Sequence, residues 1–282
     1  MPILYVVLPC YNEEAVLPET TKRLTEKLTD MINKGVCDEK SRILYVDDGS
    51  KDKTWELIEK FHGENHLVSG VKLAHNRGHQ NALLAGLMTA KEHCDCAASM
   101  DADLQDDIDV LDGFMEKFSE GCDVVYGVRS KRTTDTAFKR STAQGYYKFM
   151  KKLGVDLVYN HADCRLMSKR ALEALSDYRE VNLFLRGIVP HIGFKSDIVY
   201  FERAERFAGE SKYPLKKMLA FAFDGITSFS VKPIRWVTVL GFLIFMLSVL
   251  ALIYILIVKL LGYTVAGWSA TVASIWLLGG IQ

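Results

Sequence analysis

The 282-residue sequence lacks both of the common glycine-rich loops that bind nucleotides. No G-x-G-x-x-G follows the first apolar run, and no G-x-x-x-x-G-K-[ST] occurs in the chain. These absences weigh against a dinucleotide-dependent oxidoreductase and against a P-loop NTPase. A phosphate group bound by this chain would need another source of positive charge, such as a metal ion.

Cysteine is sparse and scattered. The six cysteines stand at positions 10, 37, 94, 96, 122 and 164, and only Cys94 and Cys96 are close together. No second cluster and no histidine stands at the spacing of a zinc site, and the spacing does not suggest a disulfide framework. We therefore expect reduced thiols and a cytosolic compartment.

The sequence has no net charge, because 35 Lys and Arg balance 35 Asp and Glu, but the charges are unevenly distributed. Five aspartates lie within residues 101–109, whereas residues 131–152 carry seven Lys or Arg and one Asp. Crowded carboxylates repel one another, so residues 101–109 form either a solvated turn or a cation site.

The N-terminus lacks the basic region of a secretory signal, and "MPILYVVLPCYN" predicts a strand instead. Trp236–Val258 is a run of 23 uncharged residues, about 34 Å long as a helix and long enough to cross a bilayer. A buried soluble helix is the alternative. A second uncharged stretch, residues 264–282, resembles the start of another spanning helix, and we expect it to be truncated. With this helix truncated, the sequence does not decide whether the chain assembles into a homo-oligomer.

Basic residues are concentrated before the first predicted span. Lys216, Lys217, Lys232 and Arg235 precede it, and Lys259 is nearly alone beyond it. The positive-inside rule then places the N-terminal region in the cytoplasm, with a multi-pass segment in the cell membrane. The basic residues 137–153 and the amphipathic residues 206–235 can both lie on an anionic membrane surface, and a solvated basic face is the alternative. The pattern of a single-strand nucleic-acid platform is missing.

Short apolar runs alternate with helix-length periodic segments over the first half of the chain. The runs predict strands at residues 3–9, 42–49, 68–76, 96–103, 123–129 and, later, near 197–204, with helices starting near Glu13, Asp52, His79 and Asp107. This order predicts an α/β domain with a largely parallel sheet, which we place at residues 1–205. The polar segments after the first four strands should then meet at one edge, where such sheets bind ligands.

Two of these strand ends are acidic. Asp101 and Asp103 stand at i and i+2, so in an extended chain both carboxylates could meet one divalent cation, whose other ligands would be diphosphate oxygens. A D-x-D pair alone is also typical of an exposed turn. The second acidic strand end, "VDDGS", contains Asp48, which could hold ribose hydroxyls or a base edge. Together the two strand ends favour a nucleotide diphosphate with its metal ion.

Six motifs occur in order: "LPCYNEE", "VDDGSKDKT", "NRGHQNALLAG", "MDADLQDD", "YGVRSKR" and "RFAGESKYPLKK". With them the chain resembles the family 2 glycosyltransferases of the GT-A fold, and within these the polyprenyl-phosphate branch, which includes bactoprenol glucosyltransferases and dolichol-phosphate mannose synthases. The resemblance covers essentially the whole chain. The "KPIRW" string departs from the Q-x-x-R-W of processive members, which favours transfer of a single sugar.

The resemblance implies roles for residues at matching positions. The nucleotide-sugar would be bound by Pro9, Tyr11, Glu13, Asp48, Asp101 and Gln105, and Mg²⁺ or Mn²⁺ by Asp101, Asp103 and Gln105. Arg129, Arg132, Arg165, Ser211, Lys212 and Tyr213 would contact phosphate groups of acceptor or donor. Asp163, Asp103 and Arg206 would be the catalytic residues, although an Asp163 that merely pairs with Arg165 is an equal alternative.

The predicted activity is therefore inverting, metal-dependent transfer of one sugar to undecaprenyl phosphate on the cytoplasmic leaflet, for modification of a cell-envelope polysaccharide. UDP-glucose or UDP-N-acetylglucosamine is the favoured donor, and GDP-mannose the alternative. A catalytically inactive membrane adaptor with the same fold is a second hypothesis. A glycoside hydrolase is a third, but its carboxylates must lie about 5–9 Å apart across a sugar, and an i, i+2 pair suits a metal better.

Overall fold

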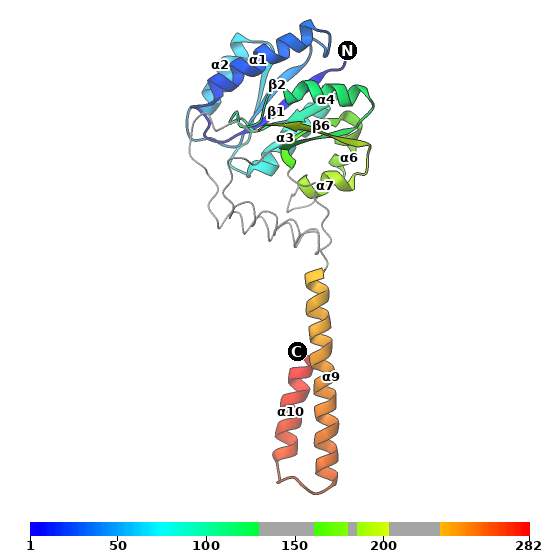
Figure 1. Cartoon of the computed structure of the whole chain (residues 1–282). Helices are drawn as coiled ribbons and strands as arrows, with labels where there is room; N and C mark the ends of the chain where they lie inside the picture. The colour runs from blue at the N-terminus through cyan, green and yellow to red at the C-terminus, as the bar shows by residue number, and fades with distance from the viewer. Residues whose placement is uncertain (130–160, 180–184, 203–231) are drawn as a thin grey trace. The chain divides into compact units, whose positions relative to one another are not determined.

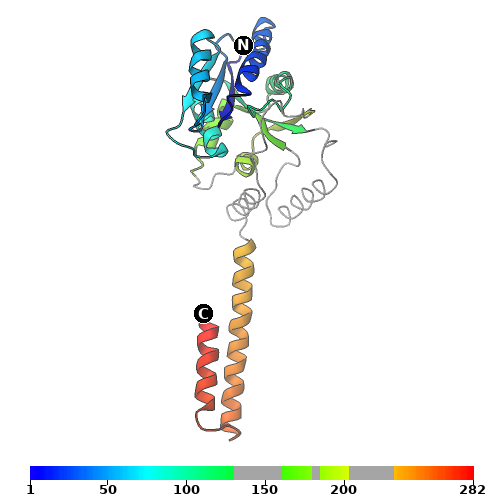
Figure 2. The same ribbon diagram turned by 90° about the vertical axis from the view of Figure 1, so that its left-hand side faces the viewer.

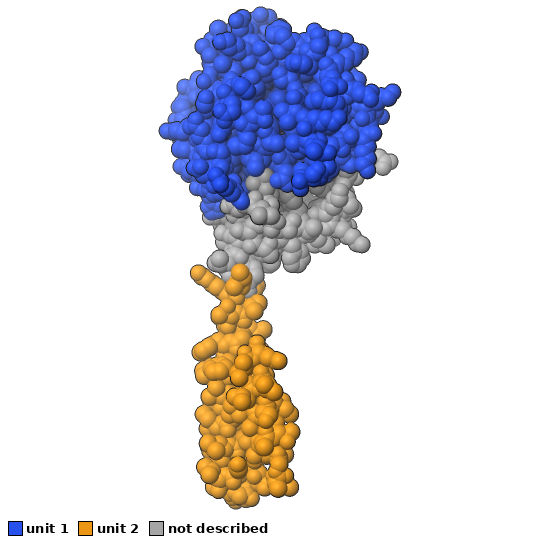
Figure 3. All heavy atoms as spheres, turned by 180° about the vertical axis from the view of Figure 1, so that it is seen from behind, with its two compact units in different colours: residues 1–228 blue, residues 229–282 orange. Residues whose placement is uncertain are grey.

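The protein was analysed as a computed structural model, which describes residues 1–129, 161–179, 185–202 and 232–282. The chain divides into two compact units, residues 1–228 and residues 229–282 (Figure 3). The predicted membrane-surface segments, residues 137–153 and most of 206–235, lie outside the described residues, so their role stays a prediction.

The first unit is built on a mixed sheet whose described strands have the order β3-β2-β1-β4-β6-β5-β7 (Figure 1). Their bounds are β1 Leu4–Cys10, β2 Arg42–Asp47, β3 Val68–Lys72, β4 Cys96–Ser99, β5 Val124–Arg129, β6 His161–Ser168 and β7 Ser196–Phe201. Strands β1 to β4 pair in parallel, as do β5 and β7. Strand β6 was not predicted, and it runs antiparallel between β4 and β5.

Helices cover both sides of this sheet (Figures 1 and 2). They are α1 Leu17–Asn33, α2 Thr54–Glu64, α3 His79–Lys91, α4 Val110–Ser119, α6 Lys169–Ser176 and α7 Leu185–His191. Helix α3 packs on β1, β2 and β4 and against α6, whereas α4 packs on β5, β6 and β7. The predicted alternation of strands and helices is thus confirmed as far as β5, and the helices begin between zero and four residues after the predicted starts.

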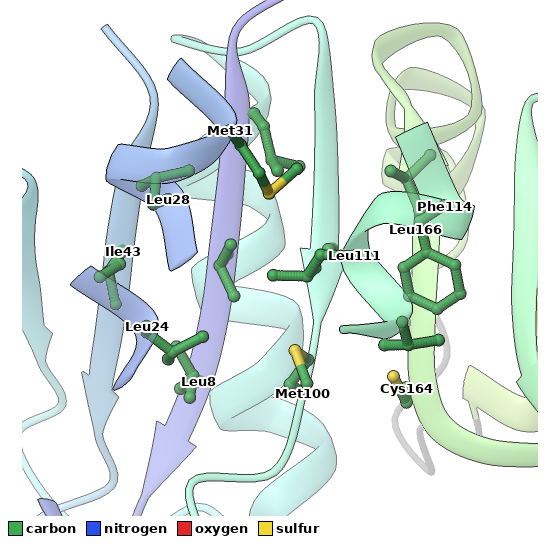
Figure 4. Packing of buried hydrophobic residues seen from close by; sticks show 14 of the residues in the cluster. Leu8, Leu24, Leu28, Met31, Ile43, Met100, Leu111, Phe114, Cys164 and Leu166 are labelled. Carbon is green, nitrogen blue, oxygen red and sulfur yellow. The ribbon is translucent and has the colours of Figure 1, made fainter. Parts of the chain in front are cut away.

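The core follows from the alternation of side chains along the central strands. On one face, Leu8 of β1 packs with Leu24 and Leu28 of α1, and all three are at most 1% exposed (Figure 4). On the other face α3 approaches the sheet closely at Gly86, where an added Cβ would lie 2.6 Å from a methyl group of Val46. Burial of each such aliphatic side chain contributes roughly 1.5–3 kcal/mol, so the sheet is rigidly held between its helix layers.

The second unit contains α9, Lys232–Leu260, and α10, Trp268–Ile281, which pack against each other as an antiparallel pair (Figure 1). The hydroxyl of Ser248 donates a hydrogen bond to the backbone carbonyl of Trp276 and so joins the two helices. In α9 the segment Ile234–Leu260 contains an 18-residue window with a mean hydropathy of 2.9 and is, among the described helices, the one that is long and apolar enough to cross a membrane. Helix α10 is also apolar but has only 14 residues.

Candidate active site

The predicted site residues that the structure describes gather at one edge of the sheet. Because β1, β2, β3 and β4 are adjacent and parallel, their carboxyl ends share this edge, as predicted. Strand β6 begins here because it runs in the opposite direction, and the hydroxyl of Ser99 at the end of β4 donates to the carbonyl of Asp163, 2.5 Å away. Strand β5 ends at the same edge with Arg129. The edge falls into two halves of different construction.

The first half consists of the loops after β1, β2 and β3, which we call the tethered half. The amide of Asn12 donates to Ser50 Oγ at 2.9 Å, and Asn12 Oδ1 accepts from the amide of Lys51 at 2.8 Å. The amide of Glu13 donates to Thr54 Oγ1 at 2.9 Å. Asn12 has a φ of 53°, a conformation that asparagine tolerates better than most residues. These bonds join the loops that carry the predicted nucleotide-binding residues Tyr11, Glu13 and Asp48, and the fourth, Pro9, lies near the end of β1.

Asp48 connects the third loop of the tethered half. Its side chain is nearly buried, and its two oxygens accept from the amides of Arg77 at 2.6 Å and Gly78 at 2.9 Å. The next residue, Gly49, has a φ of +69°, and a Cβ there would lie 2.8 Å from backbone atoms of His75 and Asn76. Asp48 therefore positions the loop before α3, and its predicted contact with the nucleoside stays a prediction.

The second half, which we call the charged half, contains Asp101, Asp103, Asp106, Asp163, His79 and the arginines around them. Our expectation of an extended chain through Asp103 is wrong, because β4 ends at Ser99 and the chain turns. Leu104, with a φ of 56°, holds the turn, and Asp103 Oδ1 accepts from the amide of Gln105 at 3.1 Å. The side chain of Asp101 is 36% exposed, whereas Asp103 is 7% exposed. The two carboxylates therefore differ in accessibility.

Asp163 is held by a network of cations. Its Oδ1 accepts from Arg165 Nη2 at 2.8 Å and from Arg186 Nε at 2.9 Å, and its Oδ2 accepts from Arg186 Nη2 at 2.9 Å. Burial opposes ionisation of Asp163, but the charge and hydrogen bonds of Arg186, with His79 and Arg165, outweigh burial and hold its pKa well below the usual range. Asp163 is therefore a stable carboxylate and a weak base. Asp163 does pair with Arg165, with Arg186 as an unpredicted further partner, and the catalytic role of Asp163 stays a prediction.

His79, the first residue of α3, lies between the two acidic groups. Its Nε2 is 3.5 Å from Asp163 Oδ2 and 3.8 Å from Asp101 Oδ1. Burial lowers the pKa of His79, but the attraction of these two carboxylates is larger in sum and raises it. In contrast, the pKa of Asp101 is raised, mainly because burial removes water from its carboxylate. His79 opposes this effect, and the nearby carboxylates of Asp163 and Asp103 add to it. His79 therefore links the carboxylate after β4 to the one in β6.

A second pair, Asp106 and Arg129, extends the charged half. Arg129 Nη2 donates to Asp106 Oδ1 at 3.2 Å, while Asp106 Oδ2 is buried with no hydrogen-bond partner among the described residues. Burial and the charge of Asp101 raise the pKa of Asp106 to about 6 against the attraction of Arg129. Arg129 therefore offsets the effect of burial on the Asp106 carboxylate only in part.

With this geometry established, sequence comparison identifies the family. The sequence model described as glycosyl transferase family 2 matches residues 5–176. The chain belongs to glycosyl transferase family 2. The glycosyltransferase is 60% identical over 281 residues to the uncharacterized glycosyltransferase YkoT of Bacillus subtilis (strain 168), covering 100% of this chain and 83% of the relative.

Two further comparisons extend this result. The glycosyltransferase is 37% identical over 282 residues to the prophage bactoprenol glucosyl transferase homolog of Escherichia coli (strain K12), covering 98% of this chain and 89% of the relative. It shares its fold with glucosyl-3-phosphoglycerate synthase from Mycobacterium tuberculosis, solved with Mn²⁺, UDP-glucose and phosphoglyceric acid. That match has a TM-score of 0.51 and 17% identity, and it covers 81% of this chain and 78% of the synthase. The predicted GT-A fold is thereby confirmed.

The donor groups of the charged half fit a hard divalent cation. Asp101, Asp103 and Asp106 offer carboxylate oxygens, and Asp106 Oδ2 is buried without a hydrogen-bond partner in the described part of the chain. Among the described residues, no three His, Cys, Asp or Glu side chains come together as a metal site. Mg²⁺ is commonly bound by one or two carboxylates plus substrate phosphates, and that arrangement suits this glycosyltransferase.

Sequence reasoning missed two members of the charged half, His79 and Arg186, and assigned Arg165 differently. Arg165 is 1% exposed and donates to Asp163 and to the carbonyl of Leu185, so here it is a structural partner of Asp163. The motif containing His79 was noticed, but nothing in its spacing indicated contact with Asp101 and Asp163. The predicted residues Arg132, Arg206, Ser211, Lys212 and Tyr213 lie outside the described residues.

Proposed function

We propose that this glycosyltransferase moves a single sugar from a nucleotide-diphospho-sugar to the phosphate of a polyprenyl phosphate. Undecaprenyl phosphate is the proposed acceptor, and UDP-glucose or UDP-N-acetylglucosamine the proposed donor. One observation carries the proposal: similarity to the bactoprenol glucosyl transferase homolog extends over 98% of the chain and so includes both the charged half and the apolar α9. The product would serve modification of a cell-envelope polysaccharide.

The charged half suits this chemistry because the reaction needs no strong base. A phosphate monoester has a second pKa near ~6, so its oxygen is already an anionic nucleophile at neutral pH. That oxygen forms a bond to the anomeric carbon while the bond from this carbon to the diphosphate breaks, and the configuration inverts. Asp163, with its lowered pKa, can orient cationic groups around the reactants but is poorly suited to accept a proton.

We propose that Asp101, Asp103 and Gln105 hold Mg²⁺ or Mn²⁺ against the diphosphate of the donor. When bound, such a cation stabilises the charge that develops on the departing nucleotide diphosphate. The tethered half would hold the nucleoside through Pro9, Tyr11, Glu13 and Asp48, because its loops are already ordered by hydrogen bonds to one another. The donor is then fixed before the acceptor enters, which contributes to the rate through orientation.

We further propose a membrane location for the reaction, with the catalytic unit in the cytoplasm. In support, α9 has the length of a bilayer span, and only 11% of its most apolar window is buried, unlike the core helix of a soluble protein. Arg235 is the second residue of the segment Ile234–Leu260, and the sequence that precedes α9 contains Lys212, Lys216 and Lys217. A polyprenyl acceptor has its hydrocarbon chain in the bilayer and its phosphate at the surface, within reach of an enzyme anchored there.

A donor panel tests this proposal. The full chain is reconstituted in liposomes containing undecaprenyl phosphate and incubated with Mg²⁺ or Mn²⁺ and, separately, UDP-glucose, UDP-N-acetylglucosamine and GDP-mannose. We expect release of UDP that depends on the lipid, together with a lipid product whose mass increases by one hexose or one N-acetylhexosamine. Release only with GDP-mannose would support the alternative donor. No release with any donor would contradict the proposal and favour an inactive adaptor.

A further inference from the structure

The turn after β4 is held by a helix that is distant in the sequence. The hydroxyl of Thr20, on α1, donates to the backbone carbonyl of Ala102 at 2.8 Å. Thr20 is 1% exposed and Ala102 is 4% exposed, so this bond is shielded from water. Among the described residues, the carbonyl of Ala102 accepts no other hydrogen bond. The bond therefore satisfies a buried polar group that would be costly to leave without a partner.

The Thr20 hydroxyl makes more than the usual bond of a helical threonine. Such a hydroxyl commonly bonds the carbonyl of residue i−4, and that of Thr20 is also 3.1 Å from the carbonyl of Val16. A hydroxyl has a single proton to donate, and the carbonyl of Ala102 is the nearer of the two acceptors. The neighbouring Thr21 differs, because its hydroxyl lies 2.9 Å from that of Tyr45 and so joins α1 to β2 instead.

Ala102 stands between two candidate cation ligands, Asp101 and Asp103. Its carbonyl belongs to the peptide group that links it to Asp103, so a bond to this oxygen restrains the backbone from which the Asp103 side chain projects. The turn needs such a restraint, because Leu104 has a φ of 56°, which is unfavourable for a bulky residue. Thr20 supplies this restraint from outside the turn.

Helix α1 also borders the tethered half. It begins at Leu17, and the amides of Val16 and Leu17 donate to the carbonyl of Glu13 at 3.1 and 3.0 Å. Glu13 is a predicted nucleoside-binding residue whose own amide is held by Thr54. One helix therefore contacts the loop proposed to hold the nucleoside and, through Thr20, the turn proposed to hold the cation.

We propose that Thr20 is a positioning residue for the cation site, which orients Asp101 and Asp103 toward the metal ion without contacting it. The inference rests on the proposed function, and in particular on the proposed binding of Mg²⁺ or Mn²⁺ by this turn. Removal of a group that orients metal ligands typically lowers metal affinity by about 10- to 100-fold. Mg²⁺ also demands near-ideal octahedral geometry, so ligands held at a fixed spacing favour its binding.

The test compares variants that differ by one hydroxyl group. Thr20→Val keeps the shape of the side chain and removes its hydroxyl, whereas Thr20→Ser keeps the hydroxyl. Thr20→Ala, compared with Thr20→Ser, measures the same loss in a smaller side chain. Thr21→Val is the matched control, because it removes a buried hydroxyl of the same helix that bonds elsewhere. For each full chain, titration calorimetry gives the affinity for UDP with Mn²⁺ and with EDTA, and urea denaturation gives the stability.

We expect Mn²⁺ to strengthen UDP binding to wild type, Thr20→Ser and Thr21→Val alike. In Thr20→Val and Thr20→Ala this gain should fall by about 10-fold or more, while the affinity for UDP in EDTA is unchanged. Thr20→Val and Thr21→Val each lose the bonds of one buried hydroxyl, so we expect both to be less stable than wild type. A different response to Mn²⁺ in these two variants then reports on the turn and not on stability.

The remaining outcomes separate this inference from the proposed function. If Thr20→Val and Thr20→Ala keep the gain of wild type, the Thr20 bond only stabilises the fold, and the inference is wrong while the proposed cation site stands. An equal loss of the gain in Thr20→Val and Thr21→Val would also overturn the inference. If Thr20→Val does not fold, Thr20→Ser and Thr20→Ala decide by the same criterion. Wild type that binds UDP equally well with Mn²⁺ and with EDTA would contradict the proposed cation site and the inference together.

Discussion

The two halves of the sheet edge are held by different forces. In the tethered half, backbone amides of one loop donate hydrogen bonds to side-chain oxygens of another. Examples are the bonds from the amide of Asn12 to Ser50 Oγ and from the amide of Arg77 to Asp48 Oδ1. In the charged half, side chains pair with side chains, and Asp163 alone contacts two arginines. Backbone bonds preserve a shape whatever ligand is present, whereas charge pairs can be rearranged by an incoming ion. In the function we propose, the tethered half is a preformed nucleoside site and the charged half responds to phosphates and metal.

The largest effect is expected from Asp103→Asn in the charged half. Loss of a candidate metal-binding carboxylate should lower turnover by about 10³-fold or more, because the departing diphosphate loses its stabilisation. Folding should be retained, since asparagine keeps the oxygen that accepts from the amide of Gln105. Turnover with UDP-sugar and the far-UV circular dichroism spectrum are measured together. Asp109→Asn, at an exposed residue paired with Lys27, is the control and should be active; an active Asp103→Asn would refute the metal assignment.

Asp163→Asn should reduce both activity and stability. The buried Arg165 would lose its counter-charge, and breaking a buried pair costs about 3 kcal/mol or more. Release of Arg186 from its two bonds should also lower turnover, by about 10- to 100-fold. Urea denaturation gives the first quantity and initial rates at saturating donor the second. A variant as stable as wild type would show that the pair contributes nothing to folding.

In the tethered half, Gly49→Ala should act through shape alone. Its positive φ and a Cβ 2.8 Å from the backbone of His75 and Asn76 predict a loss of about 2 kcal/mol with a raised KM for the donor. Gly121→Ala is the matched control, since Gly121 also has a positive φ, of +83°, but its Cβ would meet only the Lys195 amine at 4.0 Å. Thermal denaturation and donor KM are compared. If both variants raise the donor KM equally, the contact with the third loop has no role.

These results can be set against what the sequence could predict. The parallel strands β1 to β4 and their acidic ends follow from local apolar runs, and the predicted convergence is confirmed. Strand β6 was missed because its sequence, "HADCRLMS", carries charges at Asp163 and Arg165 that a buried strand rarely contains. Each charge is compensated by the other, and this pairing is visible only in three dimensions.

The turn after β4 shows a second limit of sequence reasoning. A D-x-D pair is compatible with an extended strand and with a turn, and the left-handed conformation of Leu104 decides for the turn. Bulky residues rarely adopt this conformation, so no rule of propensity would have placed it there. Likewise His79 and Arg186 join the charged half from helices far apart in the sequence, and their contacts with Asp163 depend on the packing of α3 and α7.

The smallest effect concerns a charge pair outside the site, Asp123 with Arg170. Burial opposes ionisation of Asp123, but hydrogen bonds from Arg170 and Ser168 lower its pKa below the ordinary value of about 3.9. The carboxylate therefore stabilises the fold above about pH 4, and this contribution is lost as the pH falls through the lowered pKa. Asp123→Asn should be less stable than wild type by an amount constant from about pH 7 to 5 and shrinking below about pH 4.

This pair also provides the contrast for Asp163. Arg170 is 66% exposed, so the stability lost in Asp123→Asn should be well below that in Asp163→Asn, and turnover should be unchanged. Denaturation midpoints across the pH range measure the first quantity. A gap between Asp123→Asn and wild type that widened in acid would contradict the assigned direction of the pKa.

The most direct measurement of the whole account is the affinity for UDP, by titration calorimetry, of wild type, Asp103→Asn and Asp163→Asn, with Mn²⁺ and with EDTA. The account predicts that Mn²⁺ strengthens UDP binding to wild type and to Asp163→Asn alike, while Asp103→Asn loses this gain. Asp163→Asn should keep its affinity for UDP although its stability and turnover are reduced. Binding to wild type that is equally tight in EDTA, or equal loss of binding in both variants, would contradict the division of the site into a part that holds the donor and a part that orients groups around the reactants.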